Sequence, residues 1–365
     1  MGDVLVIGAG LAGSAAACLL ARAGIQVHLI ERETGPHHKV CGEFLSAEAL
    51  AHLSQLGVRP EALGGVPIET IRLVCGRRQA RAALPFPAMG LSRYVLDEAL
   101  LARAEAAGAR IERGVRVTRL DGATAHTNRG EMTGDRILLA TGKLPVREDV
   151  DTAAYRVRDG YVGFKMHYRL APAASRRLRG TILLALLDGG YAGLQMVEDG
   201  RANLCLVIRR SRLSRLGGGW DCLPDWLGQA RELETMLGDA EPLFDRPATI
   251  ANLSYGMPPK PADTDPVFRL GDRWAMTASL TGDGMAIALR SGFVAARCLS
   301  AGEDSSAYRR RLVAHARGQI ARAIAVQKAL ALPGAGMVAC GLAAMLPSAL
   351  RFGAQATRIP AWQTG

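Results

Sequence analysis

Three glycines near the N-terminus are the first residues whose spacing indicates chemistry. Gly8, Gly10 and Gly13 form the pattern G-x-G-x-x-G directly after the apolar run 4–7. In such a turn the first glycine permits a sharp bend, the second lets backbone N–H groups approach a pyrophosphate, and the third lets a helix pack closely. The helix expected from residue 14 onward directs the positive end of its dipole toward the phosphates. The spacing therefore predicts a dinucleotide-binding turn.

A carboxylate follows at the distance that this turn requires. Glu31 comes at the end of a second expected strand, 25–30, and Arg32 follows it. A carboxylate about 20 residues beyond the glycines accepts hydrogen bonds from ribose hydroxyls. Strand, turn, helix, strand and acid occur in the order of one βαβ unit, which favours a Rossmann-like domain over an ordinary glycine-rich turn. This pattern alone does not separate FAD from NAD.

The elements up to residue 151 continue this α/β pattern with one excursion. Ser92 is a plausible N-cap for a helix that runs through Ala106, and a second helix is expected over 47–56. A strand excursion lies within 68–90, with a hairpin from 68–74 and 77–86. Strands are also expected over 110–117 and 135–142, with a short hairpin through 121–129.

Residues 152–262 have a different pattern, which predicts an antiparallel sheet with helices on one face. Asp199-Gly200 marks a hairpin turn. We expect a basic, glycine-rich loop over 210–219 and an amphipathic helix over 223–237. The expected strands are 162–170, 181–187, 191–197, 202–209 and 249–255.

The first pattern then resumes, so the first domain is discontinuous. A strand at 267–270 is followed by a glycine-containing loop, 278–285, that opens a helix to about residue 299. A long helix is expected over 305–330. The predicted organisation is a Rossmann-like domain over 1–151 and 263–330, an inserted antiparallel-sheet substrate domain over 152–262, and an apolar helical segment over 331–365.

Composition limits the classes of partner. The chain has 365 residues and a net charge of +11, much of it in arginine clusters. Such a balance fits an acidic substrate, an anionic membrane or simply an arginine-rich surface. No basic patch interleaved with aromatic residues favours nucleic acid. The 7 cysteines are scattered and form no C-x-x-C pair. Together with an N-terminus that enters a strand at once, they indicate a cytoplasmic protein without a signal peptide or structural zinc.

Two features leave alternatives open. His37 and His38 are adjacent on an expected loop with no evident third ligand, so we expect no metal. The segment 329–350 has no charged residue and is long enough to span a bilayer, but it contains Pro333, Pro347 and several glycines. It is therefore a transmembrane helix, a buried helix, or a helix that lies on a membrane surface or over an apolar pocket.

Three separated motifs resemble the FAD-dependent monooxygenases of the para-hydroxybenzoate hydroxylase fold and the related geranylgeranyl reductases. The glycine turn with Glu31 resembles their ADP-binding signature. Gly271-Asp272, followed by Gly282-x-Gly284, looks like their second FAD motif. Arg93-x-x-Leu96-Asp97-x-x-Leu100 looks like their flavin-contacting arginine helix. The resemblance covers most of the chain.

Two further segments are similar to the reductase branch. Cys41-Gly42-Glu43 resembles a segment near the flavin, and 191–203 resembles an aromatic strand and hairpin of the substrate domain, although Gly193 and Leu194 replace its bulky centre. The hydroxylases' internal Asp-Gly motif is not clear, and Ala140-Thr141-Gly142-Lys143 stands at the comparable strand end, which leaves the use of NAD(P)H open. Gly219-Trp220-Asp221 lacks the second tryptophan of the flavin halogenases, which argues against halogenation.

The resemblance implies FAD as cofactor and NAD(P)H as reductant, with chemistry carried by the flavin itself. The expected cofactor-binding residues are Gly8, Gly10, Leu11, Ala12, Gly13, Glu31, Arg32, Cys41, Gly42, Arg93, Val117, Thr141, Gly142, Gly271, Asp272, Gly282, Gly284 and Met285. The expected substrate pocket contains Tyr191, Phe164 and Met166. Cys41 is a candidate redox-active thiol or a small packed residue.

Three functions remain in competition. The leading one is a monooxygenase that hydroxylates an apolar or aromatic small molecule through a flavin hydroperoxide. The alternative is a flavin-dependent reductase of a double bond in an isoprenoid or polyketide, which the uncharged segment 329–350 favours. The third is a flavin-binding protein without catalysis. A peripheral contact with a membrane is compatible with the first two, and the sequence leaves the oligomeric state open.

Overall fold

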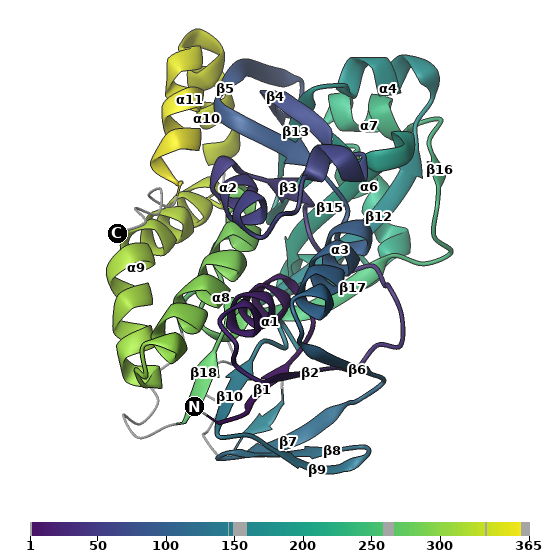
Figure 1. The fold of residues 1–365 in the computed structure, drawn as a ribbon. Coiled ribbons are helices and arrows are strands. Elements are labelled where there is room, and N and C mark those ends of the chain that lie inside the picture. Colours follow the sequence, from purple (N-terminus) through teal and green to yellow (C-terminus); the bar gives the residue numbers. More distant parts are fainter. Residues whose placement is uncertain (1, 145, 149–158, 258–265, 333, 359–365) are drawn as a thin grey trace.

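The computed structural model describes residues 2–144, 146–148, 159–257, 266–332 and 334–358 (Figure 1). Its first layer is a parallel sheet with strand order β18-β10-β1-β2-β6. The central strand β1 is buried along its whole length, as expected for a strand covered on both faces. The five strands are β1 (Val4–Ile7), β2 (Val27–Glu31), β6 (Arg110–Arg113), β10 (Arg136–Leu139) and β18 (Val267–Arg269). The Rossmann-like sheet predicted from the sequence is confirmed.

Helices pack on one face of this sheet, and a small second sheet lies on the other. α1 contacts both α8 and α3, and α8 also contacts α2 and α9. The helices are α1 (Leu11–Arg22), α2 (Ala47–Gln55), α3 (Arg93–Ala106), α8 (Gly284–Ser300) and α9 (Ser305–Leu330). The small sheet contains β7 (Val117–Asp121), β8 (Thr124–Thr127), β9 (Gly130–Thr133) and β11 (Arg147–Glu148). Ser92 caps α3 as predicted, since its hydroxyl accepts from the N–H of Val95.

The second large sheet crosses the upper part of the molecule (Figure 1). Its pairings are antiparallel except for β4 with β13, which run parallel. The excursion 68–90 thus belongs to the same sheet as the inserted segment. The predicted domain boundaries at 151–152 and 262–263 lie outside the described residues. The strands are β3 (Phe44–Leu45), β4 (Val66–Cys75), β5 (Arg78–Gly90), β12 (Tyr161–Arg169), β13 (Thr181–Leu187), β14 (Gly190–Met196), β15 (Ala202–Arg209), β16 (Glu241–Pro242) and β17 (Ala248–Leu253).

Short helices cover one face of this sheet, and two predictions there were wrong. The expected loop 210–219 begins as a helix, because Leu213 buries its side chain in the core. The expected helix 223–237 is broken, because Ala230 has an extended backbone between two helices. The helices are α4 (Pro172–Leu178), α5 (Arg210–Leu216), α6 (Leu223–Leu227) and α7 (Arg231–Leu237).

Two C-terminal helices, α10 (Ala335–Met345) and α11 (Pro347–Ala356), cover the other face of the sheet at its β4–β5 end (Figure 1). They contain most of the uncharged segment 329–350. Within the described residues no individual helix has both the length and the apolarity to cross a bilayer. The helices α9 and α10 have the required length and apolarity only when they are taken together, and the pair is bent by 107°.

The contact between α1 and α8 gives a first prediction. A Cβ at Gly292 would lie 2.5 Å from the carbonyl oxygen of Ala12, whereas a Cβ at Gly318 in α9 would meet nothing within 4 Å. We expect Gly292→Ala to lower the free energy of unfolding by about 1–3 kcal/mol through overpacking. The matched control Gly318→Ala is expected to raise it by about 0.5–1 kcal/mol, because alanine restricts the unfolded chain and favours helix. Urea unfolding measures both; equal effects would contradict the packing described here.

Candidate functional site

One cavity of about 830 Å³ links the glycine turn to the face of the large sheet under the C-terminal helices. Its polar end is lined by the turn after β1, by Glu31 and by Arg93. Its other end is lined mainly by apolar side chains of the large sheet and of α9–α11. The cavity therefore offers a polar site and an apolar site that are continuous with each other.

The glycines of the turn have distinct roles. Gly8 has φ of +106°, and a Cβ there would lie 2.6 Å from the carbonyl oxygen of Ala140. A Cβ at Gly13 would lie 2.0 Å from the carbonyl oxygen of Gly8. A Cβ at Gly10 would have its nearest neighbour, Nη2 of Arg93, 3.5 Å away. The close contacts at Gly8 and Gly13 thus leave no room for a side chain, whereas the free space at Gly10 is part of the cavity.

Glu31 lies where a ribose-binding carboxylate is expected. Its Oε2 accepts from the backbone N–H of Ala9 at 2.7 Å, and its Oε1 accepts from the N–H of Glu33 at 3.0 Å. These bonds fix the carboxylate at the end of β2 beside the glycine turn, where it lines the cavity. Each carboxylate oxygen has a second lone pair with which to accept a ribose hydroxyl.

Arg93 is held at the cavity by an acidic partner one helical turn away. Its Nε and Nη2 donate to the two carboxylate oxygens of Asp97 at 2.6 and 2.9 Å, and Lys39 also donates to Asp97 at 2.7 Å. Burial alone raises the pKa of Asp97, but the Arg93 and Lys39 charges lower it more, so the net pKa lies below its ordinary value. Asp97 therefore stays ionised and orients two cations near the turn, where a phosphate or the flavin is expected.

The second predicted FAD motif also lines the cavity. Asp272 and Lys143 form an ion pair of 3.2 Å, and both residues line the cavity. The 17-residue helix α8 begins at Gly284, so its N-terminal N–H groups and dipole lie at the cavity wall. Gly282, with φ of +74°, packs against the ring of Phe44. A helix N-terminus at this point stabilises negative charge on a bound group.

The predicted cofactor residues meet at the cavity with one exception. Gly13 lies behind the lining and acts through packing. The cavity is lined by Gly8, Gly10, Leu11, Ala12, Glu31, Arg32, Cys41, Gly42, Arg93, Val117, Thr141, Gly142, Gly271, Asp272, Gly282, Gly284 and Met285. The space at Gly10, the fixed carboxylate of Glu31 and the helix N-termini of α1 and α8 fit a dinucleotide such as FAD.

Of the three residues expected in the substrate pocket, the structure places one at the cavity and two away from it. Tyr191 lines the cavity, but Phe164 and Met166 do not. Phe164 packs in the core beneath the short helices, with its ring 5.7 Å from that of Trp220. Successive side chains of a strand point to opposite faces. Phe164 and Met166 thus face away from the cavity, while Lys165 between them points to the other face, where it contacts Glu43.

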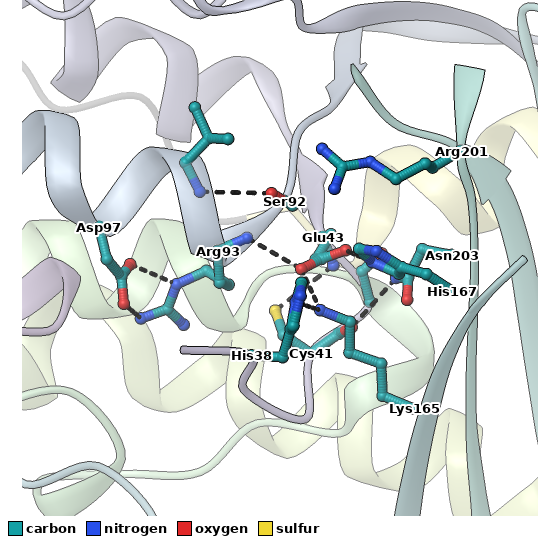
Figure 2. Close-up of polar contacts among 12 residues, drawn as sticks. His38, Cys41, Glu43, Ser92, Arg93, Asp97, Lys165, His167, Arg201 and Asn203 are labelled. Carbon is teal, nitrogen blue, oxygen red and sulfur yellow. Dashed lines mark hydrogen bonds and ion pairs between the residues drawn. The ribbon is translucent and has the colours of Figure 1, made fainter. Parts of the chain in front are cut away.

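Sequence reasoning missed a buried charged cluster around Glu43 (Figure 2). Figure 2 shows Glu43 between Arg93 on one side and Lys165 and His167 on the other. The Glu43 carboxylate accepts from the backbone N–H of Arg93 at 2.8 Å, from Nζ of Lys165, and from Nε2 of His167 at 2.7 Å. The side chains of Glu43, Lys165 and His167 are fully buried. The available signal was the presence of Lys165 and His167, two positions apart, in the expected strand 162–170.

The charges of this cluster balance one another. Burial alone raises the pKa of Glu43, but the Lys165 ammonium and His167 lower it more, so the net pKa lies below its ordinary value. Burial, with the nearby Lys165 and His167, lowers the pKa of His38 to about 4. Glu43 is thus ionised and His38 neutral at neutral pH.

The same cluster brings together side chains that could bind a metal ion, an arrangement that the sequence did not indicate. Ligand atoms of His38, Glu43 and His167 lie within 4.8 Å of one another. Lys165 donates to Glu43 and lies 3.5 Å from Nδ1 of His38. Because its ammonium already supplies a cation there, we assign these residues to an ion cluster.

Amide side chains from β14 and β15 hold the loop that contains Cys41 at the cavity wall. Nδ2 of Asn203 donates to the carbonyl oxygens of Cys41 at 3.1 Å and Gly42 at 2.9 Å. Nε2 of Gln195 donates to the carbonyl oxygen of Glu43 at 2.7 Å, where Glu43 has a φ of +57°. The large sheet thus fixes the loop that faces the predicted flavin site.

Comparison with known proteins agrees with this geometry. Residues 1–136 match the family model described as FAD binding domain. Menaquinone reductase of Mycobacterium tuberculosis is 37% identical over 119 residues, which cover 31% of this chain and 29% of that protein. Digeranylgeranylglycerophospholipid reductase 2 of Methanopyrus kandleri is 26% identical over 331 residues, or 85% of this chain and 80% of that protein. Squalene epoxidase 5 of Arabidopsis thaliana is 41% identical over 64 residues, or 18% of this chain and 12% of that protein.

Solved structures show the same fold at low sequence identity. The flavin-dependent brominase Bmp2 superposes with a TM-score of 0.74 at 19% identity, covering 98% of this chain and 93% of that one. A geranylgeranyl bacteriochlorophyll reductase-like protein from Thermoplasma acidophilum superposes with a TM-score of 0.74 at 17% identity, covering 95% of this chain and 91% of that one. The chain therefore shares the fold of these proteins, and its residues 1–136 match the FAD binding domain model. The resemblance noted in the sequence is confirmed, while the match to menaquinone reductase spans less than a third of that protein's length.

The free space at Gly10 gives a prediction about cofactor binding. Gly10 has φ of −80°, which alanine adopts readily, so Gly10→Ala is expected to leave the stability of the FAD-free protein unchanged. The added methyl group would occupy space at the pyrophosphate site and raise the Kd for FAD by about tenfold or more, equivalent to about 1.4 kcal/mol. Flavin fluorescence titration measures this change. Gly35→Ala, where a Cβ meets nothing within 4 Å, is the control, and an equal effect there would refute the assignment.

The buried cluster gives a prediction about stability. Lys165→Met leaves the Glu43 carboxylate without its ammonium partner and is expected to cost about 3–5 kcal/mol. The double variant Lys165→Met/Glu43→Gln removes both charges and is expected to recover most of that loss. Urea unfolding of wild type, both single variants and the double variant measures the coupling. If the loss of stability in the double variant equals the sum of the losses in the two single variants, the pair is not coupled.

Proposed function

We propose that the protein is an FAD-dependent reductase that saturates a carbon–carbon double bond in an isoprenoid chain. From the sequence alone the monooxygenase was favoured and this reductase was the alternative. The observation that carries the new preference is the apolar arm of the cavity, which is continuous with the predicted flavin site. A flexible hydrocarbon chain fits such a site better than a compact aromatic ring does.

The apolar arm lies between the large sheet and the C-terminal helices. Its walls come from β4, β5, β13, β14, β15 and β17 on the sheet side and from α9, α10 and α11 on the other. Gly193 in β14 adds no side chain and so keeps the arm wide near Leu184. The lining includes Ile71, Leu73, Leu84, Phe86, Ile182, Leu184, Val207, Ile250, Leu330, Leu342 and Leu350.

The relatives support this substrate class. A relative that is similar over 85% of this chain is named as a reductase of a digeranylgeranyl lipid, and the menaquinone reductase is also named as a reductase. By analogy with these names we assign an isoprenoid chain to the apolar arm.

Reduction of a double bond requires a hydride and a proton. FAD, when bound and reduced, would supply the hydride, and NAD(P)H is our proposed source of its electrons. Within the cavity Tyr191 holds a proton at its phenolic oxygen, because burial raises its pKa well above the ordinary value. Ser279, which also lines the cavity, shares a hydrogen bond of 2.9 Å with the hydroxyl of Tyr255. We propose Tyr191 as the proton donor, because it is protonated and lines the cavity.

A monooxygenase acting on a similar apolar chain is the second candidate, and the local similarity to squalene epoxidase 5 favours it. The two functions differ in their need for oxygen: a monooxygenase forms no product without it. A flavin-binding protein without catalysis would show reduction of the flavin but no turnover with any chain.

The proposed apolar site predicts an effect that depends on chain length. A Cβ at Gly193 would lie 3.5 Å from Cδ2 of Leu184, so alanine fits there but a phenylalanine ring would extend into the arm. We expect Gly193→Phe to weaken binding of geranylgeraniol by about tenfold or more, while geraniol, half as long, binds as in wild type. Titration of the FAD-bound protein, followed by flavin absorbance, measures both. Gly193→Ala is the control; equal weakening for both alcohols would contradict the assignment.

A further inference from the structure

Exposed apolar side chains gather on the C-terminal helices. Of the ten large apolar side chains that are exposed in the described part of the chain, eight lie between residues 326 and 352. Soluble surfaces rarely carry such a concentration unless another phase or molecule covers it. We call these residues the C-terminal apolar patch: Val326, Leu332, Met337, Val338, Leu342, Met345, Leu346 and Phe352.

The patch adjoins the apolar arm of the cavity. Val326 and Leu342 are 40% and 55% exposed, and both also line the cavity. The opposite sides of α10 and α11 pack on β5, at the outer edge of the molecule (Figure 1). An apolar chain held at the patch is therefore next to the arm.

The charged residues in the last part of the sequence have one sign. The sequence from residue 305 to the C-terminus has no aspartate or glutamate, but it carries basic residues at 309–311, 317, 322, 328, 351 and 358. Arg351 lies on α11 itself and is exposed, and Lys328 lies at the end of α9. From the neighbouring hairpin, Nη1 of Arg78 donates to the carbonyl oxygen of Met337 at 3.3 Å. Anionic headgroups complement a basic margin around an apolar face.

We propose that the C-terminal apolar patch docks on the surface of an anionic lipid bilayer. Met345 and Phe352, at 81% and 75% exposure the most exposed members, insert among the acyl chains. Arg351 and Lys328 contact the headgroups. The delivery of an isoprenoid chain from the bilayer to the arm rests on the proposed function, whereas docking does not.

The test is sedimentation of the FAD-bound protein with vesicles, in the absence of any substrate. Vesicles of phosphatidylcholine alone are compared with an equimolar mixture of phosphatidylcholine and phosphatidylglycerol. We expect binding to the anionic vesicles that weakens with salt. Met345→Gln/Phe352→Gln is expected to weaken it about tenfold or more, and Arg351→Glu by about fivefold or more. Arg176→Glu, an equal change of net charge on α4, is the control and is expected to bind as wild type does.

Three results would overturn docking: no binding of wild type to either vesicle, equal binding by wild type and the patch variants, or an equal loss in Arg176→Glu. A wild-type dimer that Met345→Gln/Phe352→Gln converts to a monomer would instead show that a second copy covers the patch. Turnover is measured separately with a detergent-dispersed chain. Vesicle binding without turnover would support docking and reject the reductase. Turnover without vesicle binding would support the reductase and reject docking.

Discussion

The close backbone contacts at the glycine turn are the constraint on which the rest of the structure depends. Gly8 and Gly13 allow β1 to turn directly into α1, and Gly292 allows α8 to pack against α1 near Ala12. These contacts bring the N-termini of two helices to one end of the same cavity. A site for a negatively charged dinucleotide follows from this packing, since each helix contributes unpaired N–H groups and the positive end of its dipole.

The buried cluster around Glu43 connects this site to the second sheet. Glu43 follows Cys41 and Gly42 in the loop at the cavity wall, and its partners Lys165 and His167 belong to β12. Separating a buried charge from its partner would lower the free energy of unfolding, so these contacts hold the loop in a fixed position relative to the sheet. The wall that would face the flavin and the sheet that lines the apolar arm are therefore positioned by one set of ionic contacts.

Local signals were sufficient for much of the fold and for the polar end of the cavity. The long helix 305–330 and the strand 181–187 were predicted with the bounds that the structure has. The glycine turn and the arginine helix at Arg93 were found because their chemistry lies within a few residues of sequence. Phe164 and Met166 could not be placed relative to the cavity from the sequence, because alternation along a strand does not tell which face meets a cavity. The Glu43 cluster joins segments more than 120 residues apart, which single-sequence patterns do not connect.

The central claim is that reduced flavin in this cavity delivers a hydride to a double bond of an apolar chain. The most direct measurement is the mass of the product after the FAD-bound protein, reduced by dithionite without oxygen, is incubated with geranylgeraniol. The account predicts a product heavier by the mass of two hydrogen atoms for each bond reduced, formed without oxygen and absent when FAD is omitted. A product that appears only after oxygen is admitted, and is heavier by one oxygen atom, would contradict the account and identify a monooxygenase.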